Sequence, residues 1–185
     1  LKTTNGGLNW TKSLDWTNNQ SRGIWDILYN PLNHNIIYAA TTEGIYKSYD
    51  AGNYWVQVYS AQMVTDLEIN RIDTSTIFAG IGNLSSPSPG LYRSTDSGLN
   101  WSKLTSGLPG SANDGRITVS SYYSNPSIVF AVFGNRNSTV GVYRSDDNGD
   151  NWIQTSGVSP DFLDDQGWYA NGIKVKDTDS SKLLF

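Results

Sequence analysis

A repeated turn sequence constrains the fold of this chain more than any other feature. Four copies share the pattern S/T-x-D/N-x-G-x-x-W and end at Trp10, Trp55, Trp101 and Trp152. These tryptophans are 45, 46 and 51 residues apart, a period close to that of one four-stranded propeller blade. A Gly-x-Tyr-Lys/Arg segment precedes the last three copies without a gap. So many matching columns do not arise by chance, so the chain is a repeat protein.

Each position of the pattern has a structural reason. Asp or Asn accepts hydrogen bonds from nearby backbone N–H groups, Ser or Thr adds a local bond, Gly adopts a positive φ, and Trp buries a large ring. We therefore expect Asp50, Asp96 and Asp147 to bond to backbone amides of their own turns, with the following Gly at positive φ and the Trp rings of these three turns largely buried. The structural residues of the four copies are Asn5, Gly7 and Trp10; Ser48, Asp50, Gly52 and Trp55; Ser94, Asp96, Gly98 and Trp101; and Ser145, Asp147, Gly149 and Trp152.

The segments between the turns predict an all-β protein. Each full period contains four short apolar runs separated by Gly, Asn, Asp, Pro or Ser, and no stretch shows apolar residues at helical spacing. The prediction is a β-propeller segment of four-stranded antiparallel blades, with the repeat turn between the third and fourth strands. Within a single unit 1–185, we expect blades at 24–59, 64–105 and 116–156 and half blades at 1–14 and 168–185. The last of these begins with a strand predicted over 168–176. The outermost strands of the second and third blades are predicted over 100–105 and 151–155.

The repeat turns resemble Asp boxes, also called BNR repeats. Such repeats occur in sialidases, sortilin-type receptors, xyloglucan-degrading endoglucanases, the photosystem II assembly factor and many secreted bacterial propellers. The resemblance covers essentially the whole chain and implies the propeller fold. It says little about activity, because the box in this family is a folding device away from the catalytic face. The first copy departs from the pattern, with Asn5 in place of Asp.

The two half blades are complementary, since the first holds third and fourth strands and the last holds first and second strands. They either close a four-bladed ring or leave the chain as an arc of a larger ring. We favour the arc, because propellers of the family it resembles usually have six or more blades. Backbone hydrogen bonds between the segments around Lys2 and Leu184 would establish the closed ring.

Composition excludes several classes of function. The net charge is −4 and no basic cluster occurs, so we expect no nucleic-acid partner, and no apolar run is long enough for membrane insertion. The chain has no cysteine and one histidine, His34, so thiolate metal sites, zinc sites and a Ser-His-Asp triad lack residues. Residues 146–150 carry side-chain oxygens at alternate positions, as a calcium-binding loop does. However, the glycine is not at the position that such a loop requires, and the twelfth position is Gly157 instead of Glu. No phosphate-binding glycine loop occurs. We expect no cofactor and no metal.

A complete sialidase site is also not expected. Resemblance to that family would require an arginine triad, an Arg-Ile-Pro segment and a Tyr paired with Glu. The chain contains six arginines, of which Arg93 and Arg144 belong to the repeat, no Arg-Ile-Pro segment, and only two glutamates, Glu43 and Glu68.

The remaining candidate residues lie on loops between blades. In the family that this chain resembles, these loops and the loops between the second and third strands form the ligand-binding face. The acidic segment 161–167 precedes Trp168 and Tyr169, and a two-carboxylate glycosidase or a sugar stacked on an indole could use such a loop. A solvated acidic loop and tryptophans filling the core are the competing interpretations, and we favour the core for Trp25. The candidate ligand-binding residues are Asp15, Trp16, Arg22, Asp114, Asp164, Asp165, Trp168 and Tyr169.

The sequence thus favours a non-catalytic extracellular bacterial propeller module that binds a glycan or a protein or has a structural role. Its partners would include further blades of the parent chain or neighbouring subunits. The alternative is part of a glycoside hydrolase whose other catalytic residues lie outside the segment. An enzyme should bring two carboxylates with perturbed pKa values over the central channel, whereas a scaffold should show none.

Overall fold

The computed structural model describes residues 1–16, 21–83, 86–110, 115–155 and 161–184. These residues form three four-stranded antiparallel sheets and one two-stranded sheet. The one helical element among them is a short 3-10 turn, η1 (Asp164–Gln166). The all-β fold class and the four-stranded antiparallel blades are therefore confirmed.

Each four-stranded sheet takes its strands in chain order, so sequence neighbours pair in space. The first sheet contains β1 (Ile24–Tyr29), β2 (Ile37–Thr41), β3 (Gly44–Ser48) and β4 (Val56–Ser60). The second contains β5 (Val64–Ile69), β6 (Ile77–Ile81), β7 (Gly90–Ser94) and β8 (Ser102–Lys103). The third contains β9 (Ile117–Ser121), β10 (Val129–Gly134), β11 (Thr139–Ser145) and β12 (Ile153–Gln154), and the last pairs β13 (Lys174–Lys176) with β14 (Asp179–Leu184).

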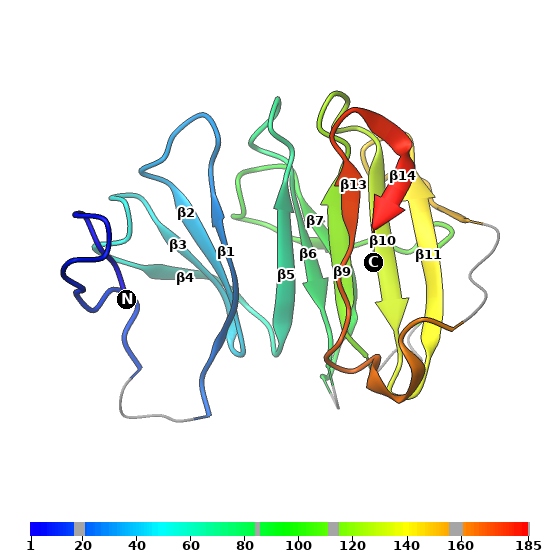
Figure 1. Cartoon of the computed structure of the whole chain (residues 1–185), viewed down its shortest axis with the longest axis horizontal. Helices are drawn as coiled ribbons and strands as arrows, with labels where there is room; N and C mark the ends of the chain where they lie inside the picture. The colour runs from blue at the N-terminus through cyan, green and yellow to red at the C-terminus, as the bar shows by residue number, and fades with distance from the viewer. Residues whose placement is uncertain (17–20, 84–85, 111–114, 156–160, 185) are drawn as a thin grey trace.

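The sheets stand side by side along an arc, with β1, β5, β9 and β13 at the front of the view (Figure 1). We call these four the inner strands, because each is the edge strand of its sheet and packs against an inner strand of a neighbouring sheet. The apolar core lies between adjacent sheets. Tyr38 and Ile45 of the first sheet pack with Leu67 of the second, and Phe78 of the second packs with Ile117 of the third.

The repeat turns have the local bonding that the sequence predicts. The Asp50 carboxylate accepts hydrogen bonds from the backbone N–H groups of Asn53 and Tyr54, at 3.0 and 2.9 Å. The corresponding bonds of Asp96 go to residues 99 and 100, and Asp147 accepts from the amide of residue 151. The glycines of all four turns have φ between 81° and 92°. The residue before that glycine also has a positive φ in all four turns, which the sequence did not indicate.

The tryptophans of the turns are buried to different degrees, and Trp10, which lies outside the three turns for which burial is expected, is the most exposed. Trp152 is 4% exposed, Trp55 and Trp101 are half-buried, and Trp10 is 57% exposed. Trp10 lies in the first half blade, where a single bridge between Lys2 and Thr11 is the only pairing among the described residues. This half blade lies at one end of the arc, and no further sheet is drawn beyond it (Figure 1).

Two strand predictions are also corrected. The outermost strands β8 and β12 have two residues each, whereas β4, the outermost strand of the first sheet, has five. The strand predicted over 168–176 spans only 174–176. In the segment before β13, the Asn171 side chain donates hydrogen bonds to the backbone carbonyls of Arg116 and Val132. These side-chain bonds hold the segment in place of the strand pairing that was expected.

The ends of the chain do not meet. Lys2 pairs with Thr11, whereas Leu184 pairs with Lys174, and the two ends lie in different parts of the arc (Figure 1). The described residues therefore form an open arc and not a closed four-bladed ring, and the larger ring stays a prediction. No helix among the described residues is long and apolar enough to span a membrane.

Candidate functional site

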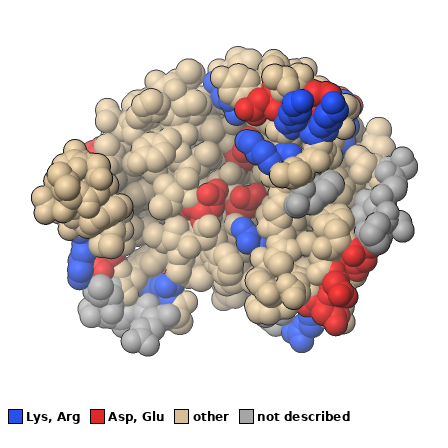
Figure 2. Space-filling view, viewed as in Figure 1, with Lys and Arg blue, Asp and Glu red and all other residues tan. Residues whose placement is uncertain are grey.

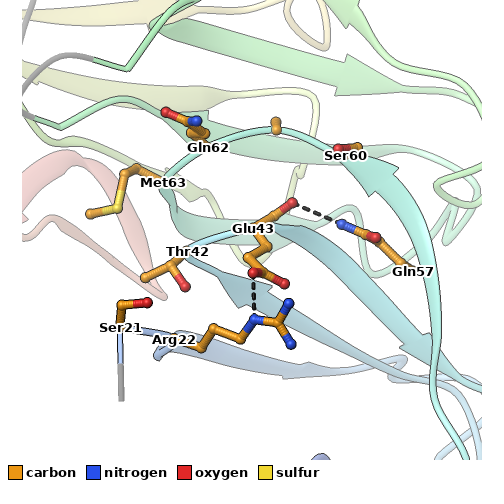
Figure 3. Close-up of a pocket in the computed structure, with 9 residues that line it drawn as sticks. Ser21, Arg22, Thr42, Glu43, Gln57, Ser60, Gln62 and Met63 are labelled. Carbon is orange, nitrogen blue, oxygen red and sulfur yellow. Dashed lines mark hydrogen bonds and ion pairs between the residues drawn. The ribbon is translucent and has the colours of Figure 1, made fainter. Parts of the chain in front are cut away.

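The loops that lead into the inner strands lie at one end of the sheets, which we call the loop face (Figure 1). A pocket of about 530 Å³ opens there, at the end of the first sheet and beside the linker that leads into β5. Most of its lining is polar, and Figure 3 shows the side chains around it. The lining residues are Ser21, Arg22, Thr42, Glu43, Gln57, Ser60, Ala61, Gln62 and Met63.

An ion pair between Arg22 and Glu43 lies in this pocket (Figure 3). The Gln57 side chain donates to the backbone carbonyl of Glu43 at 2.8 Å, so strand β4 and the loop between β2 and β3 are held together. Met63 adopts a φ of +60°, which is uncommon for a residue with a side chain and costs free energy. The pocket thus combines charged groups, hydroxyls and amides on loops anchored by sheet strands.

Trp16 and Arg22, two of the predicted binding residues, come together beside this pocket. The Arg22 guanidinium lies 5.9 Å from the Trp16 ring centroid, and that ring meets Tyr46 edge-on at 5.3 Å. Trp16 is half-buried, so one part of the indole packs and another part remains accessible. Asp15 forms an ion pair with Lys12 at 3.1 Å.

The other predicted group lies at the opposite end of the loop face (Figure 1). Asp164 and Asp165 are exposed in η1, and the half-buried Trp168 ring lies 4.4 Å from that of Tyr169. Asp161, on the same loop, accepts hydrogen bonds from the amide and hydroxyl of Thr139, and these bonds lower the pKa of its carboxyl. The structure does not combine the two groups into one site, and Asp114 lies outside the described residues. The roles predicted for these eight residues stay predictions.

Carboxylates on the inner strands were missed by the sequence analysis. The Asp26 carboxylate on β1 accepts from the amide of Leu67 on β5 at 3.2 Å. In the same way, Asp66 on β5 accepts from the amide of Val119 on β9 at 2.6 Å. Each carboxylate therefore bonds to the open edge of the next inner strand. Figure 2 looks onto these strands and shows acidic side chains near the middle of the surface, with basic side chains beside them.

Glu68 makes a third link of this kind, since it accepts from both the amide and the hydroxyl of Ser121. Desolvation by burial raises the pKa of Asp66 to about 7, and burial also raises the pKa of Glu68. The available signal was the alternation of acidic and apolar residues over 64–69, which places both carboxylates on one side of a strand.

These carboxylates bear on the choice between an enzyme and a scaffold. Two channel-side carboxylates with raised pKa values are what an enzyme should show, but both accept hydrogen bonds from the backbone of the next sheet. Their geometry is that of cross-links between blades. Among the described residues, no group of three or more His, Cys, Asp or Glu side chains could hold a metal ion.

Comparison with known proteins supports the fold. An ancestral GH74 enzyme aligns with a TM-score of 0.61 and 24% identity over 75% of this chain and 19% of the enzyme. The GH74 enzyme of Niastella koreensis aligns with a TM-score of 0.58 and 21% identity over 76% of this chain and 23% of the enzyme. The GH74 xyloglucanase of Xanthomonas campestris has a TM-score of 0.64 and 18% identity over 88% and 26% of the two chains.

The chain spans about a fifth to a quarter of the length of these enzymes. At such low identity the similarity shows the fold alone: the protein is a segment of a β-propeller. No protein-family model and no curated protein sequence matches the chain.

Proposed function

We propose that this propeller segment is a non-catalytic binding module that takes a glycan in the pocket at the loop end of its first sheet. The observation that carries the proposal is the polar pocket around the Arg22–Glu43 ion pair, with the accessible part of Trp16 beside it. Charged and amide groups hydrogen-bond to sugar hydroxyls, and an indole packs against the apolar face of a sugar ring. The same proposal assigns the repeat turns to the Asp-box class and places the protein outside the cell.

Isothermal titration calorimetry with a panel of soluble neutral and acidic oligosaccharides tests the binding role. We expect at least one of them to bind and the Arg22→Gln variant to bind it about tenfold or more weakly, because a hydrogen bond to a charged group contributes about 1.5–3 kcal/mol. The matched control is Trp168→Ala, which changes the other predicted group. If Trp168→Ala abolishes binding and Arg22→Gln does not, the site lies at the other end of the loop face. If no oligosaccharide binds, the proposal fails.

A second candidate function is part of a glycoside hydrolase. It is favoured by the fold similarity to GH74 enzymes and by Asp66, whose raised pKa suits a general acid. Against it stand the backbone hydrogen bonds to Asp66 and Glu68. We expect the chain alone to release no reducing ends from soluble β-glucans, including xyloglucan. Hydrolysis that disappears in Asp66→Asn but persists in Asp161→Asn would replace the binding role with catalysis.

A further inference from the structure

The pocket on the loop face lies over a short connection between a second and a third strand. In the first sheet β2 ends at Thr41 and β3 begins at Gly44, so the connection has two residues, and the second of them is Glu43. The same connection covers 82–89 in the second sheet and 135–138 in the third. The short connection leaves the end of the first sheet open, and Glu43 lines the pocket there.

The backbone of Glu43 is held from both sides. Its amide donates to the hydroxyl of Thr41 at 3.2 Å. Its carbonyl accepts from the Gln57 side chain at 2.8 Å and from the amide of Ala61 at 3.3 Å. These partners come from β2, from β4 and from the linker that follows β4. Because the backbone is fixed, the place of the carboxylate depends on the rotation of its own side chain.

Two further side chains orient the Glu43 carboxylate. The Arg22 guanidinium donates to one carboxylate oxygen through Nε (Figure 3). The Tyr46 hydroxyl lies near the same carboxylate, and the pKa of Tyr46 is raised, first by burial and then by the negative charge of Glu43. Tyr46 therefore keeps its proton and faces a charged carboxylate. The Trp16 ring packs edge-on against Tyr46, which limits the movement of the tyrosine.

The ion pair leaves hydrogen-bonding groups for a ligand. Among the described residues, Nε is the one guanidinium nitrogen of Arg22 with a hydrogen-bond partner, so its two terminal nitrogens remain as donors. One oxygen of Glu43 binds Arg22, and the carboxylate has lone pairs for further donors. Ser60 and Gln62 also line the pocket, and their side chains can both donate and accept. A ligand must offer donors and acceptors together, as sugar hydroxyl groups do.

The charges in the pocket decide which sugars it accepts. Arg22 and Glu43 carry opposite charges, and the other residues that line the pocket are uncharged. A sugar carboxylate that reached Arg22 would also lie close to Glu43, so repulsion from Glu43 would offset the attraction of Arg22. The sugar carboxylate would lose bound water without a net gain in charge pairing. A neutral sugar forms its hydrogen bonds in the pocket without that loss.

We propose that Glu43 determines the charge of the ligand: the pocket accepts neutral glycans and excludes glycans that carry a carboxylate on the sugar it holds. This inference rests on the proposed function, because it names the class of glycan that the same pocket binds. Arg22 and Tyr46 act as positioning residues for the Glu43 carboxylate. Every group that carries the inference belongs to the first sheet or to the segments on either side of it.

Titration calorimetry with matched pairs of oligosaccharides tests the selectivity of the unchanged protein. Cello-, manno- and galacto-oligosaccharides of equal length are used in neutral form and after oxidation of C6 to a carboxylate. We expect the neutral member of a pair to bind at least about tenfold more tightly than the oxidised member. Equal or tighter binding of the oxidised member overturns the inference and leaves the proposed function standing. If no member of any pair binds, both are overturned.

The Glu43→Gln variant tests the residue itself, because glutamine keeps the size and hydrogen bonding of the side chain and removes its charge. We expect the variant to bind the oxidised member at least about tenfold more tightly than the unchanged protein does, since Arg22 then has no competing carboxylate. Circular dichroism confirms that the variant is folded. A variant that is folded and keeps the original preference for the neutral member overturns the inference.

The matched control is Asp73→Asn, which removes the same charge in the turn between β5 and β6, away from the pocket. Asparagine fits that turn, because Asn33 and Asn125 hold the same place in the first and third sheets. The carbonyls of all three residues accept from the amide three positions later. We expect Asp73→Asn to keep the preference of the unchanged protein. An equal shift in Asp73→Asn and Glu43→Gln shows an effect of net charge alone and overturns the inference.

Discussion

Replacing Gly149 by alanine is expected to destabilise the protein by about 2–5 kcal/mol. Gly149 has a φ of +90°, where a side chain adds about 1–2 kcal/mol of strain. A Cβ at this position would lie 2.6 Å from the Phe78 ring, which is fully buried between the second and third sheets. Displacing a well-packed ring costs about 1–3 kcal/mol more. The substitution would therefore weaken both the repeat turn that contains Gly149 and the packing between the second and third sheets.

Urea unfolding followed by tryptophan fluorescence measures this loss, and Gly6→Ala provides the control. Gly6 also has a positive φ, but no atom lies within 4 Å of where its Cβ would be. Gly6→Ala should cost only the backbone strain, about 1–2 kcal/mol. Equal losses in the two variants would contradict the contact between the turn and Phe78.

The stability of the protein is expected to fall as the pH rises from about 4 to 8. The pKa of Asp66 is about 7 in the folded chain, raised by burial, against 3.8 for an ordinary aspartate. Below pH 4 both states are protonated, and between these values the folded state keeps a proton that the unfolded state has lost. Raising the pH therefore favours unfolding, by up to about 4 kcal/mol at 1.36 kcal/mol per pKa unit. The raised pKa of Glu68 acts in the same direction.

Denaturant titrations at pH 5 and pH 8 measure the effect. Asp66→Asn should flatten the difference between the two pH values, since its amide oxygen can still accept from Val119 without carrying a charge. Asp161→Asn is the control, because hydrogen bonds from Thr139 lower the pKa of Asp161 and its contribution changes only below about pH 4. An unchanged chain that is equally stable at both pH values would contradict the buried charge at Asp66.

The repeat made most of the fold predictable. A turn that needs an acceptor at Asp96 and a positive φ at Gly98 is encoded within eight residues, so its geometry follows from local chemistry. The strands next to such turns are apolar and short, and strands that are neighbours in the chain pair with each other. The outermost strands β8 and β12 were predicted too long, because the number of residues that pair depends on the partner strand, which the sequence of one strand does not reveal.

The candidate site was predictable only in part. Trp16 and Arg22 were selected from the loops, but their contact, and the partnership of Arg22 with Glu43, required distant loops to be placed together. The alternation that places Asp66 and Glu68 on one side of a strand was visible in the sequence. Their hydrogen bonds to the next blade were not. These bonds depend on the open edge of β9, which lies more than fifty residues away in the chain.

The sequence by itself determined the all-β class, the repeat and the bonding within its turns, because each rests on contacts between residues close in the chain. Tertiary structure alone decided which tryptophan is covered, which carboxylates cross-link the blades and that the arc stays open. The same turn buries Trp152 and exposes Trp10, since burial depends on whether a neighbouring sheet is present. Packing between sheets joins residues that are distant in the chain. A local sequence pattern therefore cannot determine which sheet, if any, packs against it.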